Sequence, residues 1–401
     1  MAGRPAESSS LMSNVPPTPL CPDTSSGSIL HRLARSRGSG SPKLVRVYVL
    51  VVAATYLPLL LAARLGSEAV PLWGNGTGPL TFFRDWGLGY AVLVSLPTLV
   101  VLLVSDEHVL STSLDEVQRD GVIAVSENAA VSFRATWTRH FRVYNLIAQF
   151  AGLVLGIVLG IVTLRFVMPN GSVMPSGSWI WPEGSLHFAG YMYFCFITLL
   201  YAVVIVYVMR GIVVSLCLRA LVALAAPLRI LPLHPDKCGG LRPVGQLGLR
   251  NQYTLTVLGI NIVLLLVVSV YATAGASAAP LRYVSIAASV AYLILAPVIF
   301  MAPLLPFRTG MREAKKVWTH EVAQLVRVEI ERLRAQIKKN EVTKLDEESI
   351  ERLRKVGAAI DELPVWPFDP STLRKFATAY IVPMALPLLA RAAGALIKAM
   401  R

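Results

Sequence analysis

Long apolar stretches, separated by polar connections, occupy most of this chain. Six of them approach the ~20 apolar residues with which a helix crosses a bilayer. They cover roughly residues 46–65, 88–104, 143–167, 187–209, 253–277 and 283–306. A weaker seventh stretch, 373–398, is interrupted by Pro383 and Pro387. The pattern predicts an all-α fold, a polytopic transmembrane helical bundle with six spans and a C-terminal element that is either a seventh span or re-entrant.

The polar segments predict the domain organisation. The first 42 residues are rich in Ser, Pro, Gly and Arg and hold too few apolar residues for a core, which predicts disorder. After the sixth stretch, apolar residues recur with the spacing of one helical face: Val322, Val326, Ile330, Leu333 and Ile337. The predicted units are a disordered cytoplasmic tail (1–42), the transmembrane bundle (43–306) with cytoplasmic loops 105–142 and 210–252, cytoplasmic amphipathic helices (307–372) and a membrane-associated or spanning helix (373–401).

Composition and charge agree with a bilayer environment and give an orientation. Of 401 residues, 54% are hydrophobic and 15% charged, against about 25% charged in soluble domains. The loops 66–87, 168–186 and 278–282 hold only Arg84 and Arg282, whereas Lys and Arg are frequent in the other loops. By the positive-inside rule, the amino terminus is predicted to be cytoplasmic. Alanine and arginine richness suits a bacterial origin, and we expect a multi-pass protein of the bacterial inner membrane.

The net charge of +14 does not indicate nucleic-acid binding, because no phosphate-binding glycine loop or base-stacking motif accompanies it. The four cysteines show no paired spacing, so we expect free thiols and neither a metal site nor a cofactor. The expected partners are the lipid bilayer, further copies of this chain, and anionic lipids or a cytoplasmic protein bound to the basic segments.

Two sets of residues inside the predicted spans stand out. Gly152, Gly156 and Gly160 are spaced to lie on one helix face, where they let another helix approach closely, within the chain or between subunits of a pore. Polar side chains are costly in hydrocarbon and often functional there. The polar set comprises Asn145, Gln149, Arg210 and Asn261. The predicted spans contain no carboxylate pair, which speaks against a proton-coupled carrier.

Two short motifs lie in predicted cytoplasmic segments. His234-Pro235-Asp236 precedes Gly239-Gly240-Leu241, and Pro364-Val365-Trp366-Pro367-Phe368-Asp369 follows the amphipathic helices. Together with the layout of the spans, these motifs resemble a family of uncharacterised bacterial multi-pass membrane proteins without a known activity. Both motifs have the residues of sharp corners, and the two corners are predicted either to be structural turns or to meet in a ligand or gating site. That candidate site comprises His234, Asp236, Lys237, Gly239, Gly240, Trp366, Phe368 and Asp369.

Three functions remain open at this point. The first is an oligomeric channel, transporter-like or signal-transducing protein, whose layout resembles, by topology only, the seven-span ligand-gated channels of insect chemoreceptors. The second is a membrane-anchored scaffold that recruits a partner through its cytoplasmic helices. The third is an enzyme at the membrane face that uses His234 and Asp236. Since no nucleophile and base are paired in the sequence, we expect no enzymatic activity and assign no catalytic residue.

Overall fold

The computed structural model describes residues 19–29, 41–65, 82–167, 180, 187–225, 227–231, 234–271, 279–339, 344–368, 374, 377, 378, 380 and 381. Every regular element in these ranges is helical. The elements are α2 (Ser41–Leu65), η1 (Phe82–Arg84), α3 (Trp86–Tyr90), the π-helical turn η2 (Ala91–Ser95), α4 (Leu96–Arg119), α5 (Glu127–Val167), α6 (Phe188–Leu224), α7 (Arg242–Tyr271), α8 (Ala279–Met301), α9 (Leu305–Lys339) and α10 (Lys344–Glu362).

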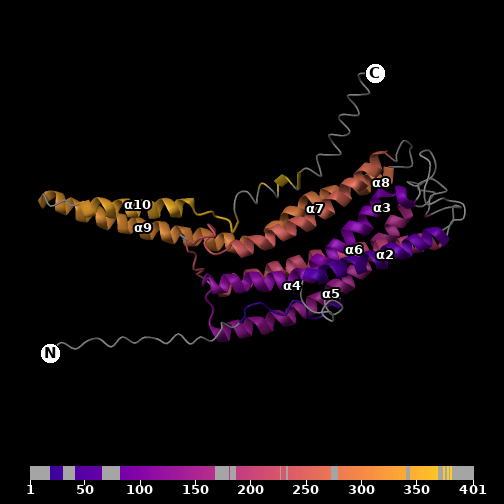
Figure 1. The fold of residues 1–401 in the computed structure, drawn as a ribbon, viewed down its shortest axis with the longest axis horizontal. Coiled ribbons are helices and arrows are strands. Elements are labelled where there is room, and N and C mark those ends of the chain that lie inside the picture. Colours follow the sequence, from indigo (N-terminus) through magenta and orange to yellow (C-terminus); the bar gives the residue numbers. More distant parts are fainter. Residues whose placement is uncertain are drawn as a thin grey trace, which may run out of the picture.

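The helices form an elongated bundle with a hairpin at one end. Helices α2 to α8 run roughly along the long axis, and α9 and α10 pair as a hairpin that extends beyond the bundle (Figure 1). The α4–α5 turn and the α6–α7 connection meet at this end, where the backbone N–H of Arg229 donates to the carbonyl of Val122. The indole N–H of Trp318 on α9 donates to the carbonyl of Ile230, 3.1 Å away, which ties the base of the hairpin to the same end.

Among the residues that the structure describes, four helices are long and apolar enough to cross a membrane. Their candidate spans are Lys43–Leu65, Trp86–Arg119, Glu127–Leu164 and Phe188–Leu224. Ile286–Met301 and Leu305–Ala335 add a fifth if this pair, bent by 49°, is counted as one span. The chain is therefore a membrane-embedded helical protein, as its apolar stretches predict. Of the predicted spans, 253–277 is described only to Tyr271 and 373–398 at five residues, so six or seven spans stay a prediction.

Helices α5 and α6 pack through the three glycines of α5. A Cβ atom on Gly152 would lie 2.9 Å from the carbonyl oxygen of Ala202, and one on Gly156 would lie 2.7 Å from that of Thr198. A Cβ on Gly160 would lie 2.5 Å from the hydroxyl of Thr198. The glycine face is thus used inside the chain. The opposite face of α5 exposes apolar side chains, among them Phe150, 71% exposed, as expected of a lipid-facing helix.

Residues 19–29, called the N-terminal segment below, correct part of the predicted disordered tail. The side chains of Leu20 and Thr24 are fully buried, and those of Cys21, Ser25 and Ser28 are buried as well. The amino-acid composition predicted disorder here because the segment has no apolar core of its own and is held mainly through hydrogen bonds to its backbone, as described below. Residues 1–18 and 30–40 lie outside the described part of the chain.

Candidate functional site

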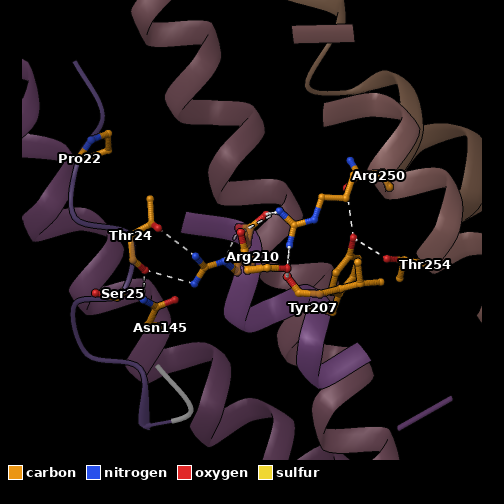
Figure 2. Close-up of polar contacts among 12 residues, drawn as sticks. Pro22, Thr24, Ser25, Asn145, Tyr207, Arg210, Arg250 and Thr254 are labelled. Carbon is orange, nitrogen blue, oxygen red and sulfur yellow. Dashed lines mark hydrogen bonds and ion pairs between the residues drawn. The ribbon is translucent and has the colours of Figure 1, made fainter. Parts of the chain in front are cut away.

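Two arginines and one aspartate from helices α4, α6 and α7 meet inside the bundle, and Figure 2 labels the two arginines, Arg210 and Arg250. Arg210 of α6 donates from Nε to Oδ2 of Asp106 on α4 over 2.6 Å. Arg250 of α7 lies with Nη1 3.5 Å from Oδ1 of the same carboxylate. The side chain of Arg210 is only 4% exposed. We call Asp106, Arg210 and Arg250 the polar centre. Its buried guanidiniums stay charged, since arginine does not lose its proton in proteins.

The polar centre is connected to further hydrogen bonds between helices. Arg250 also donates to the carbonyl and hydroxyl oxygens of Ser105, over 3.2 and 2.9 Å, and to the carbonyl of Leu102. One turn before Arg210, the hydroxyl of Tyr207 donates to Oδ1 of Asn251 over 3.1 Å and accepts from Thr254 over 2.8 Å. These bonds link α4, α6 and α7, so a shift of one of these helices changes the partners of the others.

The N-terminal segment is bound directly on the polar centre. Nη1 of Arg210 donates to the carbonyl oxygen of Thr24 over 3.2 Å, and Nη2 donates to the Thr24 hydroxyl over 3.0 Å. Figure 2 shows both bonds, with the segment lying across the end of the Arg210 side chain. Thr24 alone therefore accepts hydrogen bonds from both Nη1 and Nη2 of Arg210, the two nitrogens for which Asp106 gives no hydrogen bond.

Polar side chains of α5 hold the rest of the segment by its backbone. Asn145 donates from Nδ2 to the carbonyls of Thr24, over 3.0 Å, and Ser26, over 2.8 Å. Gln149 donates to the carbonyl of Gly27 over 3.0 Å. The Thr138 hydroxyl, on the same helix before Asn145, accepts from the backbone N–H of Asp23 over 3.0 Å. These bonds depend on the course of the chain more than on the identity of its side chains.

Gly27 and Cys21 show how closely the segment fits. Gly27 has a φ of +80°, a backbone conformation that other residues rarely adopt. A Cβ there would also lie 2.8 Å from the carbonyl oxygen of Arg142, so a larger residue would both strain the backbone and collide with α5. Burial raises the pKa of the Cys21 thiol to about 12, assisted by the carboxylates of Asp115, Glu107 and Asp106 and opposed by Arg134. A thiol of this kind is unreactive while the segment is in place.

Three of the four polar residues singled out from the predicted spans thus converge on one short segment. Asn145, Gln149 and Arg210 come from two helices, and all three donate to residues 24–27. The fourth, Asn261 on α7, donates to the hydroxyl of Ser95 and to the carbonyl of Val257. Asn261 therefore joins α7 to η2.

The His234–Gly240 loop is a packed turn at the start of α7. Oδ1 of Asp236 accepts from the backbone N–H of Cys238 over 2.8 Å, and Oδ2 accepts from those of Gly240, over 2.9 Å, and Arg242, over 3.1 Å. Burial alone would raise the pKa of Asp236, but these N–H groups and the side chain of His234 lower it. Nδ1 of His234 lies 2.8 Å from Oδ1 of Asp236. Asp236 therefore caps α7.

The backbone of this loop needs its small residues. Lys237 has a φ of 57°, and Gly239 and Gly240 have φ values of 67° and 88°. A Cβ on Gly240 would lie 2.5 Å from Cγ2 of Val122 in the α4–α5 turn, and one on Gly239 would collide with Ile230. The glycine pair is thus explained by close packing on neighbouring connections.

The second motif packs against the first turn of α7. A Cβ on Gly245 would collide with the carbonyl oxygen of Pro367. Trp366 stacks on Phe368 and lies under the guanidinium of Arg308, whose Cζ is 4.4 Å from the ring centroid. The two motifs thus lie on the same part of α7. Asp369 lies outside the described residues, and a ligand or gating role for these corners stays a prediction.

Sequence reasoning found Arg210 but missed Asp106, Arg250 and Thr24. Asp106 is the first acid after a long apolar stretch and Arg250 the last arginine before another, so both could be located by their position at span ends. Thr24 gave no signal, because its contribution is a carbonyl and a hydroxyl that nearly any tail contains.

Comparison with known proteins adds no further constraint. Protein-family models, curated proteins and solved structures give no match to this chain. The described part of the chain contains no group of three or more His, Cys, Asp or Glu side chains arranged to hold a metal ion. The resemblance to bacterial multi-pass proteins therefore stays a prediction.

Proposed function

We propose that this protein is a membrane channel or transporter-like protein in which the polar centre lies on the pathway and the N-terminal segment plugs its cytoplasmic end. The observation that carries this proposal is a pair of buried arginines that share one partly exposed aspartate where three helices meet. Ionisable groups at such positions are costly and typically mark the path of an ion or polar substrate. In the orientation predicted from loop charge, the plug lies on the cytoplasmic side.

A plug also accounts for the chemistry of the segment. Its anchors are donors on α5 and α6 that bind carbonyl oxygens, and such donors would otherwise face a polar solute or water. A short segment bound through about half a dozen hydrogen bonds and the buried side chains of Leu20 and Cys21 is suited to reversible release. The proposal includes assembly into an oligomer, whose mass in detergent is measured by light scattering.

The test is solute flux through reconstituted protein. Full-length protein is inserted into liposomes loaded with an anion-quenched dye, and iodide entry is followed for wild-type, Gly27→Ala and Ile29→Ala. Gly27→Ala collides with Arg142 and releases the plug, so its flux should exceed wild-type several-fold. Ile29 is 60% exposed, so Ile29→Ala is the matched control and should behave as wild-type. Flux for Gly27→Ala no faster than in protein-free liposomes, for iodide and also for potassium, would overturn the conduit.

A membrane-anchored scaffold is the second candidate, favoured by the α9–α10 hairpin. The hairpin extends beyond the bundle (Figure 1) and exposes Val317, Leu325 and Val328 among charged side chains. Such a surface suits a protein partner. Replacing these three residues with Ser would then abolish capture of that partner without changing flux. The enzyme hypothesis has less support, since both carboxylate oxygens of Asp236 are engaged by backbone N–H groups.

A further inference from the structure

Thr24 occupies the edge of Arg210 that best fits an oxyanion. The guanidinium uses Nε for Asp106, which leaves the Nη1–Nη2 edge for the carbonyl and hydroxyl oxygens of Thr24, at 3.2 and 3.0 Å. A carboxylate or phosphate binds such an edge with two parallel N–H···O bonds. One threonine therefore presents two neutral oxygens in place of the two oxygens of an anion.

Replacing Thr24 by an anion would strengthen both bonds. Hydrogen bonds from a guanidinium to an ionised acceptor are about twice as strong as those between neutral groups. When the segment leaves, the Nη1–Nη2 edge of a side chain that cannot lose its proton must find another acceptor, since an unpaired buried charge is costly. Water and an oxyanion are the two candidates, and the oxyanion is favoured because its two oxygens can accept charge-assisted hydrogen bonds from Nη1 and Nη2 together.

Neighbouring charges limit the affinity but do not exclude an anion. Asp106 is in contact with Arg210 and opposes a second negative charge, and Asp115 and Glu107 act on the Cys21 side of the segment. Arg250 touches the same carboxylate of Asp106 and offsets it, and Arg134 lies near Cys21. The site is therefore close to neutral overall, and we expect recognition through the forked geometry of Arg210 more than through net attraction.

We propose that the Nη1–Nη2 edge of Arg210 is a binding site for an oxyanion of the phosphate or carboxylate class, which displaces residues 19–29 when it binds. This inference rests on the proposed function insofar as displacement of the segment opens the conduit. Free phosphate and the phosphate group of an anionic lipid present the same oxygens, and the lipid is a candidate because Arg210 belongs to a helix long and apolar enough to cross a membrane.

The native Cys21 thiol reports release of the segment without any measurement of flux. In the bound segment the thiol is buried and its pKa is about 12. Release returns it to an ordinary value of ~8.5, which raises the thiolate fraction at pH 7.5 by roughly three orders of magnitude. Maleimide labelling of Cys21 is therefore expected to accelerate even when a small fraction of molecules releases the segment.

The experiment uses full-length Cys195→Ser/Cys217→Ala protein, because Cys195 is exposed and Cys217 lies beside Cys21, where release of the segment would uncover it as well. Labelling is timed in detergent with increasing inorganic phosphate, at ionic strength held constant with chloride. We expect a saturable acceleration of about tenfold or more, given the thiolate change above. The acceleration should vanish in the additional variant Cys21→Ser, while Gly27→Ala should label fast without phosphate. Acceleration that chloride reproduces equally would overturn the proposal.

Two variants test whether phosphate acts at the Nη1–Nη2 edge of Arg210 or through a general effect of salt. Arg210→Lys keeps the charge but loses the fork, so phosphate should no longer accelerate labelling. Thr24→Val removes one competing oxygen, so the phosphate concentration for half-maximal labelling should fall. If Thr24→Val responds as wild-type does, Thr24 is not the competitor and the proposal fails.

A second arm distinguishes the source of the anion. The same protein is placed in phosphate-free nanodiscs of phosphatidylcholine or of phosphatidylcholine with phosphatidylglycerol. Faster labelling only with phosphatidylglycerol assigns the site to a lipid headgroup, and acceleration only by inorganic phosphate assigns it to a free anion. No acceleration in either arm, while Gly27→Ala still labels fast, overturns the oxyanion site. Labelling that responds to anion in a protein without flux would leave this site standing and refute the conduit.

Discussion

Two tyrosine hydroxyls supply hydrogen bonds that prolines remove from helices of the bundle. Pro97 lacks the N–H that would donate to the carbonyl of Leu93, and the hydroxyl of Tyr48 on α2 donates there. Pro297 in α8 likewise leaves the carbonyl of Leu293 without its helical donor, and Tyr380 donates to it. Because the hydrocarbon region offers no water, a freed carbonyl there needs such a partner. Tyr380 thereby places this point of the carboxyl-terminal segment against α8.

We expect Tyr380→Phe to destabilise the protein by about 1 kcal/mol, the typical net contribution of one intramolecular hydrogen bond. In a Pro297→Ala background, the introduced alanine restores the helical N–H, so Tyr380→Phe should cost much less. The four unfolding free energies, measured by denaturant titration in detergent, form a double-mutant cycle. Tyr253→Phe on exposed α7 surface is the control. Equal losses in both backgrounds would mean that the tyrosine does not act through the carbonyl freed by Pro297.

A second residue-scale prediction concerns the pH dependence that Asp236 contributes. Its folded pKa is lowered, so the stabilisation is complete above the unfolded value of ~3.9 and is lost as pH falls through that value to the folded pKa. Asp236→Asn should lower Tm at pH 6, with a loss of about 1 kcal/mol expected for a weakened cap. The difference from wild-type should shrink as pH falls below about 4, because the folded protein then takes up the proton that weakens the cap.

Lys237→Gly is the matched control in the same loop, because it only relieves the positive φ of Lys237 and should not lower Tm at any pH. A Tm difference for Asp236→Asn that is constant down to about pH 2 would show that the carboxylate charge contributes nothing to the cap.

At the scale of elements, the register of α5 against α6 is set by small residues. The spacing of four that joins Gly152, Gly156 and Gly160 brings the backbones so close that side chains of α6 fill the space over the glycines. The same helix presents Asn145 and Gln149 to the N-terminal segment, about two turns and one turn before Gly152, respectively. Packing of α5 on α6 therefore also positions the donors that hold the segment near Arg210.

Gly156→Ala should destabilise the protein by about 1–3 kcal/mol, the typical cost of overpacking, because its Cβ would lie 2.7 Å from a backbone oxygen. Gly211→Ala in α6 is the matched control, since a Cβ there meets nothing within 4 Å and alanine favours the helix. Tm of both variants in detergent checks this, and Cys21 labelling should accelerate in Gly156→Ala alone. If Gly156→Ala has the same Tm as Gly211→Ala, the close approach of α5 to α6 at Gly156 does not contribute to stability.

At the scale of the whole molecule, the bundle and the hairpin differ in what stabilises them. The base of the hairpin is part of the bundle: Met311 is buried, and Nζ of Lys315 donates to the carbonyl of Leu363 over 3.0 Å. Farther out, α9 and α10 contact each other, and their ion pairs, such as Arg327–Glu331, are exposed and contribute little. The outer part of the hairpin is thus separable from the fold.

Replacing residues 324–353 with a short Gly–Ser loop should therefore leave the bundle folded, with a Tm within a few degrees of wild-type, because a loop closure costs little. Met311→Ala at the base should cost about 2–5 kcal/mol, as expected for a buried methionine. Size-exclusion profiles and Tm of the two proteins check this. A shortened hairpin that aggregates would show that the outer part is needed to complete the fold or an oligomer.

The sequence by itself determined the class of this protein, because the length and helical period of apolar stretches are local properties that a bilayer imposes on every span. It also located Arg210, Asn145 and Gln149, since polar groups are conspicuous against an apolar background. Only the tertiary structure decided what these residues bind. Their partners are backbone carbonyls more than a hundred residues away, as in the pair Thr24 and Arg210, 186 positions apart. A carbonyl carries no sequence signal, so the bound N-terminal segment could not be read from composition.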